Sequence, residues 1–251
     1  MKRPRSELEP EHTPEAIRRS LQGGPGRSFV RDFVYGAIDG AVTTFAVASG
    51  VAGAQLAPEV VVVLGVANLV ADGFSMAASN YLGARSELQE WQRIRRAEEH
   101  HIDVIPEGER EEIRQIYALK GFEGADLERV VEVITADREQ WIQTMLQEEH
   151  GLGLAEPEPV KQGLATLVAF WIAGAVPLVT FMVDLVAPGT IAEPYAWSAF
   201  FTALAFLAIG LLKGRVVGQP LARSAVETLL VGGAAAVLAY VIGALLGGLV
   251  A

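Results

Sequence analysis

The sequence contains no cysteine among its 251 residues, so it can form neither a disulfide bond nor a metal site with thiolate ligands. Any bound metal ion must therefore contact oxygen, nitrogen or thioether groups. The sequence also lacks the G-x-x-x-x-G-K loop that binds nucleotide phosphates, which argues against direct use of ATP. No apolar run follows the basic start MKRPR, so we expect no cleavable signal peptide. We interpret residues 1–28 as a disordered or loosely helical cytosolic leader.

Long apolar runs dominate the rest of the chain. Hydrophobic residues make up 51% of the sequence and charged residues 20%, and five runs approach the ~20 residues that cross a bilayer as a helix. None of the runs alternates like a barrel strand, and a helix satisfies its own backbone in hydrocarbon. The sequence predicts an all-α membrane protein with five transmembrane helices per protomer. The predicted spans are Phe33–Ala54, Val60–Leu82, Gly163–Val186, Tyr195–Leu212 and Ala225–Ala251.

The net charge of −10 is concentrated in one polar segment between the second and third runs. Residues 85–159 contain 19 Asp and Glu against 9 Lys and Arg, whereas acids and bases balance in the rest of the chain. The acidity is therefore local. We predict four regions: a leader (1–28), transmembrane helices 1 and 2 (29–84), a cytosolic acidic metal-binding module (85–160) and transmembrane helices 3 to 5 (161–251).

Lysine and arginine are absent from two of the four loops between the predicted spans, residues 55–59 and 187–194. They occur before the first span, in the acidic segment, and between the fourth and fifth spans. Because cytoplasmic loops carry the excess of positive residues, this distribution predicts a cytosolic N-terminus and acidic module, and an extracytoplasmic C-terminus.

Polar side chains inside the first two spans predict a path for ions. Asp39 lies well inside the first span, where a carboxylate costs a few kcal/mol and usually faces a cavity or a partner. Asp72, Met76 and Asn80 are four residues apart and share one stripe of the second helix. With Thr43, these residues form the predicted translocation path. Two alternatives remain: Asp39 could only hydrogen-bond a neighbouring helix, and Met76 could only fill a gap in the packing.

The acidic segment is predicted to form a three-helix module. The second span has no helix breaker before Pro106, so its helix should continue beyond the membrane to that residue. We predict a second helix over 107–119 and a third over 126–149, with a turn at Gly121 and Gly124. In the third span, Pro177 predicts a kink.

Potential metal ligands recur in this module at helical spacing. The predicted ligands are Glu98, His101, Glu109, Glu112, Met145 and Glu149. Each successive pair projects from one face of its helix, and this mixture of oxygen with nitrogen and sulfur suits Fe²⁺ or Mn²⁺ better than Ca²⁺ or Mg²⁺. An ordinary solvated acidic face is the alternative. Glu98 and His101 also spell the E-x-x-H motif of di-iron carboxylate proteins, but no second E-x-x-H occurs.

Four sequence blocks carry a resemblance to a known family. RDFVYGAIDGAVTTFAVASGV, NLVADGFSMAASNYLGARSE, EEIRQIYALKGF and WIQTMLQEEHGL resemble the vacuolar iron transporter family. The resemblance implies a homodimer of five-helix protomers that moves Fe²⁺, and often Mn²⁺, out of the cytosol in exchange for protons. It also implies that Asp39 and Met76 lie on the translocation path. The resemblance further implies that the module binds metal through Glu98, Glu109, Glu112, Met145 and Glu149. The chain differs at His101, where plant members have glutamate, and at Leu146, where a second methionine is usual.

The leading interpretation is a proton-coupled exporter of Fe²⁺, with Mn²⁺ or Zn²⁺ as further ions and no cofactor. We expect it in a prokaryotic plasma membrane, with lipid, divalent ions, protons and a second copy as its partners and with no nucleic acid. A membrane-anchored ferroxidase or iron-storage enzyme using Glu98 and His101 is the enzymatic alternative. A metal sensor anchored by its spans is a third, although an anchor requires neither five spans nor a buried acid.

Overall fold

The computed structural model describes residues 9–22, 29–153 and 155–250, and all regular elements in this part of the chain are helical. The described residues fall into two compact units. The membrane unit contains residues 29–82 and 159–250, and the polar unit contains residues 9–22 and 83–158. Of the predicted leader, η1 (Glu9–His12) and α2 (Pro14–Gln22) are helical, and its other residues lie outside the described part.

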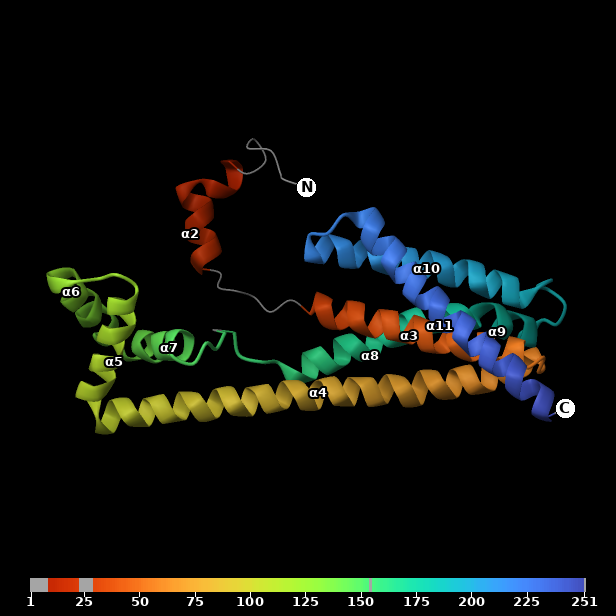
Figure 1. The fold of residues 1–251 in the computed structure, drawn as a ribbon, viewed down its shortest axis with the longest axis horizontal. Coiled ribbons are helices and arrows are strands. Elements are labelled where there is room, and N and C mark those ends of the chain that lie inside the picture. The colour runs from red at the N-terminus through yellow and green to blue at the C-terminus, as the bar shows by residue number, and fades with distance from the viewer. Residues whose placement is uncertain (1–8, 23–28, 154, 251) are drawn as a thin grey trace. The chain divides into compact units, whose positions relative to one another are not determined.

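Five helical segments of the described chain are long and apolar enough to cross a membrane, which confirms the predicted number of spans. Their helices are α3 (Val30–Gly53), α4 (Pro58–Val104), α8 (Pro159–Ala175) continued by α9 (Val179–Val186), α10 (Pro194–Val217) and α11 (Leu221–Val250). Figure 1 shows α4 as one continuous helix, and it ends just before Pro106 as predicted. Its first part belongs to the membrane unit and its last part to the polar unit.

The third span is interrupted where the sequence predicted a kink. A 3₁₀ turn, η2 (Val176–Leu178), separates α8 from α9 and contains Pro177, whose ring nitrogen cannot donate a helical hydrogen bond. The carbonyl oxygen of Pro177 instead accepts a hydrogen bond of 2.7 Å from the Ser198 hydroxyl of α10. The interruption therefore provides a polar contact between two spans.

Helix α3 is the centre of the membrane unit, because it packs against α8, α10 and α11. Glycines allow the closest of these approaches. A methyl group at Gly36 or Gly40 would collide with the backbone of α8, and one at Gly243 of α11 would collide with the backbone of Gly50. Small residues permit such packing between membrane helices, where lipid is as apolar as the helix surfaces. The glycine positions thus determine how tightly α3 is held.

The polar unit is built from the end of α4 and from α5 (Pro106–Leu119), α6 (Gly124–Thr135) and α7 (Arg138–Glu148). The prediction of one continuous third helix over 126–149 is wrong. Asp137 breaks it, since its carboxylate accepts hydrogen bonds from the backbone N–H groups of Glu139 and Gln140 at 2.9 and 3.0 Å and so caps a new helix. The signal was present in the sequence, because Asp137 with Gln140 three residues later matches a capping box.

An apolar core holds these helices together. It is formed by Ile102, Ile113, Val131, Ile134, Trp141, Ile142, Met145 and Leu146, which come from α4, α5, α6 and α7. Burying the larger of these side chains contributes about 1.5–3 kcal/mol each. The core therefore fixes the faces of α4, α5 and α7 from which the acidic side chains project.

Candidate metal centre

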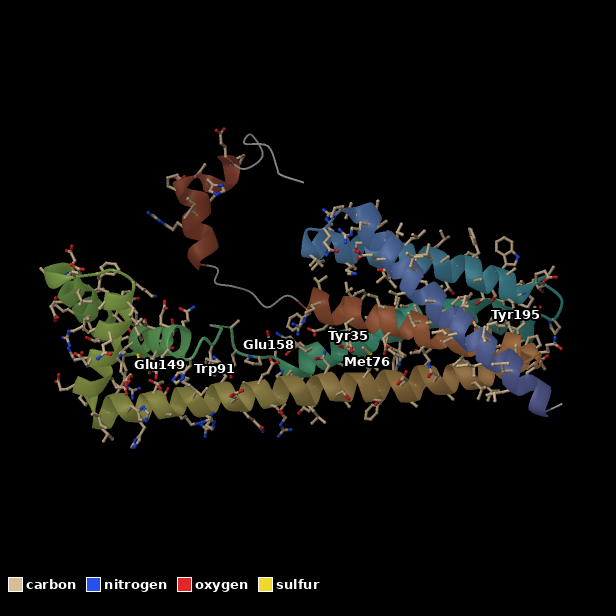
Figure 2. All side chains as sticks on the ribbon, viewed as in Figure 1. Tyr35, Met76, Trp91, Glu149, Glu158 and Tyr195 are labelled. Carbon is tan, nitrogen blue, oxygen red and sulfur yellow. The ribbon has the colours of Figure 1, made fainter. Side chains whose placement is uncertain are left out.

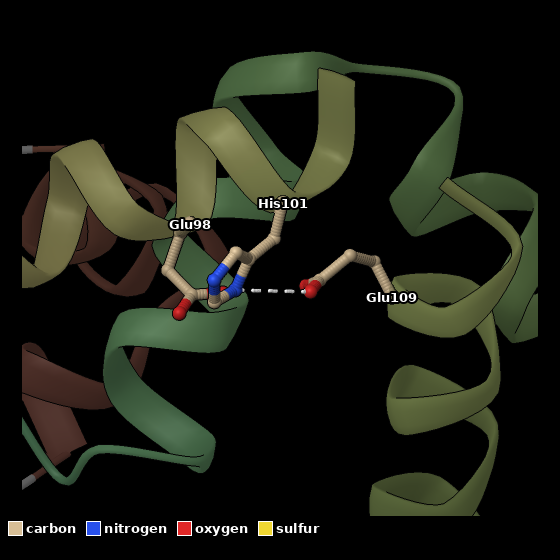
Figure 3. Close-up of side chains that lie close together, drawn as sticks. All are labelled: Glu98, His101 and Glu109. Carbon is tan, nitrogen blue, oxygen red and sulfur yellow. Dashed lines mark ion pairs between the residues drawn. The ribbon is translucent and has the colours of Figure 1, made fainter. Parts of the chain in front are cut away.

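Two buried glutamates and a histidine converge beside the core of the polar unit. Glu98 and His101 are three residues apart on α4, and Glu109 projects toward them from the first turn of α5 (Figure 3). Glu98 is 3% exposed and Glu109 is 5% exposed. The Nδ1 atom of His101 lies 3.4 Å from Oε1 of Glu109, and one ligand atom of each of the three residues lies within 4.8 Å of the others.

A second group shares Glu98 with the first and adds Glu149 and His150 from the end of α7. The Nε2 atom of His150 lies 2.9 Å from Oε1 of Glu98 and 3.6 Å from Oε2 of Glu149. The helix end places these side chains, because the N–H groups of Glu149 and His150 both donate to the Met145 carbonyl oxygen, at 3.0 and 3.3 Å. Gly151, with φ of 65°, then turns the chain away. Our sequence reasoning missed His150, although an imidazole next to a predicted ligand was a usable signal.

The two buried glutamates have oxygen atoms that no protein group satisfies. Within the described residues, Oε2 of Glu98 and Oε2 of Glu109 are buried and accept no hydrogen bond. Leaving such a group unsatisfied costs about 1–3 kcal/mol, and more for a charged group. A bound cation would remove this cost, so the donor set fits a metal ion better than it fits a solvated acidic face.

The two groups together form a cluster of Glu98, His101, Glu109, Glu149 and His150, and its electrostatics also favour a cation. Burial, followed by the neighbouring carboxylates of Glu112 and Glu98, raises the pKa of Glu109 to about 7. Burial likewise raises the pKa of Glu149, against the opposing effect of His150. The raised pKa values show that ionising these buried, neighbouring carboxyl groups is unfavourable. A bound divalent ion or protons would offset the negative charge.

The ion pairs of lysine and arginine in the polar unit lie away from these glutamates. Within the described chain, no lysine or arginine forms an ion pair with Glu98, Glu109, Glu112 or Glu149. The bases pair instead with acids outside the cluster: Arg95 with Glu99 and Glu139, Arg114 with Glu111 and Glu128, Lys120 with Glu148, and Arg138 with Asp103. No lysine or arginine therefore compensates the negative charge of the cluster, and its basic neighbours are the imidazoles of His101 and His150.

The remaining predicted ligands of the module occupy different environments. Glu112 is exposed on α5 and is close enough to Glu109 to act on its charge. Met145 is fully buried in the apolar core, one helical turn before Glu149. Ligand roles for Glu112 and Met145 remain predictions.

In the membrane unit, the carboxyl groups of Asp39 on α3 and Asp72 on α4 lie near enough to interact electrostatically. Both side chains are partly buried. The hydroxyl of Thr43 donates to the backbone oxygen of Asp39 at 2.9 Å and accepts from the amide of Asn68 at 3.3 Å. The structure thus brings together three of the residues predicted for the path, and it adds Asn68, which the sequence reasoning did not select.

Asn80 is held inside the membrane unit by several acceptors. Its amide nitrogen lies 2.7 Å from the Thr166 hydroxyl, 3.2 Å from the buried Asp32 carboxylate and 3.3 Å from the Gln162 carbonyl oxygen. These contacts join α4 to α3 and α8. Met76, one turn earlier on α4, is partly buried in the membrane unit (Figure 2). Transport roles for Met76 and Asn80 remain predictions.

The sequence of this chain is similar to those of known proteins. The model of the VIT family matches residues 30–244. The vacuolar iron transporter of Toxoplasma gondii is 34% identical over 87% of this chain and 74% of its own length. Vacuolar iron transporter 1 of Oryza sativa subsp. japonica is 32% identical over 84% of this chain and 82% of its own length. Vacuolar iron transporter 1 of Arabidopsis thaliana is 31% identical over 84% of this chain and 83% of its own length. The resemblance found in the sequence is confirmed, and this chain belongs to the VIT family.

Proposed function

We propose that this protein transports divalent metal ions, with Fe²⁺ as the main cargo and Mn²⁺ as a second, out of the cytosol in exchange for protons. The observation that carries the proposal is that two partly buried carboxylates, Asp39 and Asp72, lie inside two spans and are near enough to interact electrostatically. Ionisable groups within membrane helices mark ion or proton pathways. The relatives named as iron transporters support the choice of cargo.

In this mechanism, a cation crosses the membrane beside Met76 and Asp39. Protonation of Asp39 from the far side releases the ion, because a neutral carboxyl group no longer holds a cation. Thr43 contacts the backbone at Asp39 and joins it to α4 through Asn68, which fixes the local geometry. The polar unit gathers ions from the cytosol through Glu98, which belongs to both groups of potential ligands, and through the residues around it.

The distribution of basic residues supports a cytosolic N-terminus and polar unit with an extracytoplasmic C-terminus. We propose that the functional unit is a homodimer in a prokaryotic plasma membrane. The relatives compared above are eukaryotic, so they do not support the choice of that membrane. Large apolar side chains exposed on α4, including Val63, Val70 and Phe74, give the protomer a surface for lipid or for a second copy.

The relatives of this chain are named as transporters, so membership of their family favours transport over the ferroxidase alternative. Aerobic incubation of the full-length protein with Fe²⁺ separates the two interpretations. Stoichiometric binding without catalytic turnover to Fe³⁺ is the result expected of a carrier. Repeated turnover would instead indicate an oxidising enzyme.

The proposed activity is tested by uptake into sealed vesicles containing the purified protein. We expect Fe²⁺ and Mn²⁺ to accumulate only when a proton gradient is imposed across the vesicle membrane, and an ionophore that collapses the gradient should stop uptake. A pH-sensitive dye inside the vesicles reports the counterflow of protons. Metal uptake that is indifferent to the gradient would contradict proton exchange while leaving metal transport intact.

Metal binding by the polar unit should weaken as the pH falls through neutrality. The pKa of Glu109 is raised to about 7, so below this pH a cation must displace a proton from its carboxyl group. We expect affinity to fall by up to about tenfold per pH unit for each proton released, between about pH 8 and pH 6. Calorimetry in buffers of different ionisation enthalpy counts these protons. Glu109→Gln should bind more weakly at the upper pH and show a shallower slope; an unchanged slope would show that other groups release the protons.

A further inference from the structure

Glu98 belongs to two groups of potential ligands at once. One group contains His101 and Glu109, and the other contains Glu149 and His150. In each group, ligand atoms from the three residues lie within 4.8 Å of one another. A carboxylate has two oxygen atoms and about four lone-pair positions, so a single glutamate can serve two neighbouring cations.

The position of His150 is determined by the fold. Its backbone N–H donates to the Met145 carbonyl oxygen at 3.3 Å, and the following Gly151 has a φ of 65° that reverses the chain. The side chain is 28% exposed, and its Nε2 atom lies 2.9 Å from Oε1 of Glu98. The imidazole is therefore directed into the carboxylates.

An independent observation indicates a ligand at this point. The second oxygen of Glu98, Oε2, is buried and has no hydrogen-bond partner among the described residues, and the same is true of Oε2 of Glu109. His150 satisfies only one of the two oxygen atoms of Glu98. Three acidic side chains and two imidazoles thus form two groups that share Glu98, and one oxygen atom of Glu98 and one of Glu109 have no protein donor.

We propose that His150 is the nitrogen ligand of a cation held by the second group, together with Glu98 and Glu149. Each group of ligands then has one imidazole, His101 in the first and His150 in the second. The inference rests on the proposed function in one respect, because the ions held here are the transported cargo.

Nitrogen ligands make the two positions selective. Imidazole suits Fe²⁺, Co²⁺ and Zn²⁺, whereas sites made only of oxygen atoms suit Mg²⁺, Ca²⁺ and Mn²⁺. Affinity for a given nitrogen and oxygen site also rises from Mn²⁺ through Fe²⁺ to Co²⁺. His150 is therefore a residue that shifts the preference of the polar unit from Mn²⁺ toward Fe²⁺ and its heavier neighbours.

Binding of Co²⁺ and of Mn²⁺ to the full-length protein in detergent tests this assignment. The variant His150→Gln keeps a side chain that can donate to Glu98 but removes the imidazole. We expect Co²⁺ binding at one position to weaken by at least about tenfold, and Mn²⁺ binding to change by less than about threefold. The matched control is His100→Gln, since His100 is exposed on the same helix as His101 and belongs to neither group. Equal Co²⁺ binding by the two variants would overturn the proposal.

A second variant tests direct contact between residue 150 and the metal. The chain has no cysteine, so His150→Cys introduces a single thiol. If residue 150 contacts the ion, Co²⁺ should give an intense thiolate-to-metal charge-transfer band in this variant and none in His100→Cys. Absence of the band in the folded His150→Cys protein would also overturn the proposal. Neither readout depends on transport, so failure of vesicle uptake would remove the proposed function and leave this result standing.

Discussion

Asp39→Asn should abolish uptake of Fe²⁺ driven by a proton gradient. The amide is close to the carboxylate in size, but it can neither carry the charge that holds a cation nor accept the proton that releases it. We expect the rate to fall by at least about tenfold, equivalent to about 1.4 kcal/mol in the barrier, and to approach that of vesicles without protein. Stopped-flow or filtration assays of Fe²⁺ uptake measure the effect.

The matched control for Asp39 is Glu59→Gln. Glu59 is an exposed acid in the first turn of α4, just before the predicted second span. This variant should transport at close to the wild-type rate. Metal binding to the polar unit should be unchanged in Asp39→Asn, which separates loss of the path from loss of folding. Wild-type uptake by Asp39→Asn would remove this carboxylate from the mechanism.

Glu98→Gln should have the largest effect on metal binding by the polar unit. Because Glu98 is common to both ligand groups, its loss affects two positions, whereas loss of Glu109 or Glu149 affects one. We expect affinity to fall by at least about tenfold at each position, about 1.4 kcal/mol, measured by calorimetry on the full-length protein. Transport at saturating Fe²⁺ should persist, and the Fe²⁺ concentration giving half-maximal uptake should rise, since the polar unit gathers ions and the membrane unit conducts them.

The same variant should stabilise the metal-free protein. Glu98 is 3% exposed and keeps an unsatisfied buried oxygen, and the substituted amide can donate to Glu109. Removing this charge should therefore raise the midpoint of unfolding of the polar unit, by an amount equivalent to about 1–3 kcal/mol.

Glu99→Gln is the control. Glu99 forms a partly exposed ion pair of 2.9 Å with Arg95, worth about 0.2–1 kcal/mol, so this variant should be slightly less stable and should bind metal normally. Equal binding by Glu98→Gln and Glu99→Gln would contradict the shared role of Glu98.

The helices of this protein follow closely from local signals. The five apolar runs have the length and composition of spans, and α4 continues through an uninterrupted sequence until it ends just before Pro106. The break at Asp137, which the sequence reasoning missed, also has a local cause in helix capping.

The candidate site was only partly predictable. The spacing of Glu98 and His101 places both on one helical face, and Glu109 lies in the first turn of the next helix, where acidic side chains are favourable. His150 was not selected, because it follows the end of α7 and helical periodicity says nothing about where a side chain beyond a helix will point. The contact of Asn80 with Asp32 was likewise unexpected, since the stripe through Asp72 and Met76 had indicated a path for ions and not a contact with α3.

The sequence alone determined the number of spans, the position of the acidic segment and which residues share a helical face, because these properties depend on hydrophobic length, charge and a period of about 3.6 residues. Only the tertiary structure decided which faces meet. His150 contacts a glutamate 52 residues earlier, and Asn68 of α4 contacts Thr43 of α3, 25 residues away. Such contacts depend on the close approach of helices at glycines and on the apolar core that orients α4, α5 and α7. This packing joins residues far apart in the chain, so local sequence patterns do not predict it.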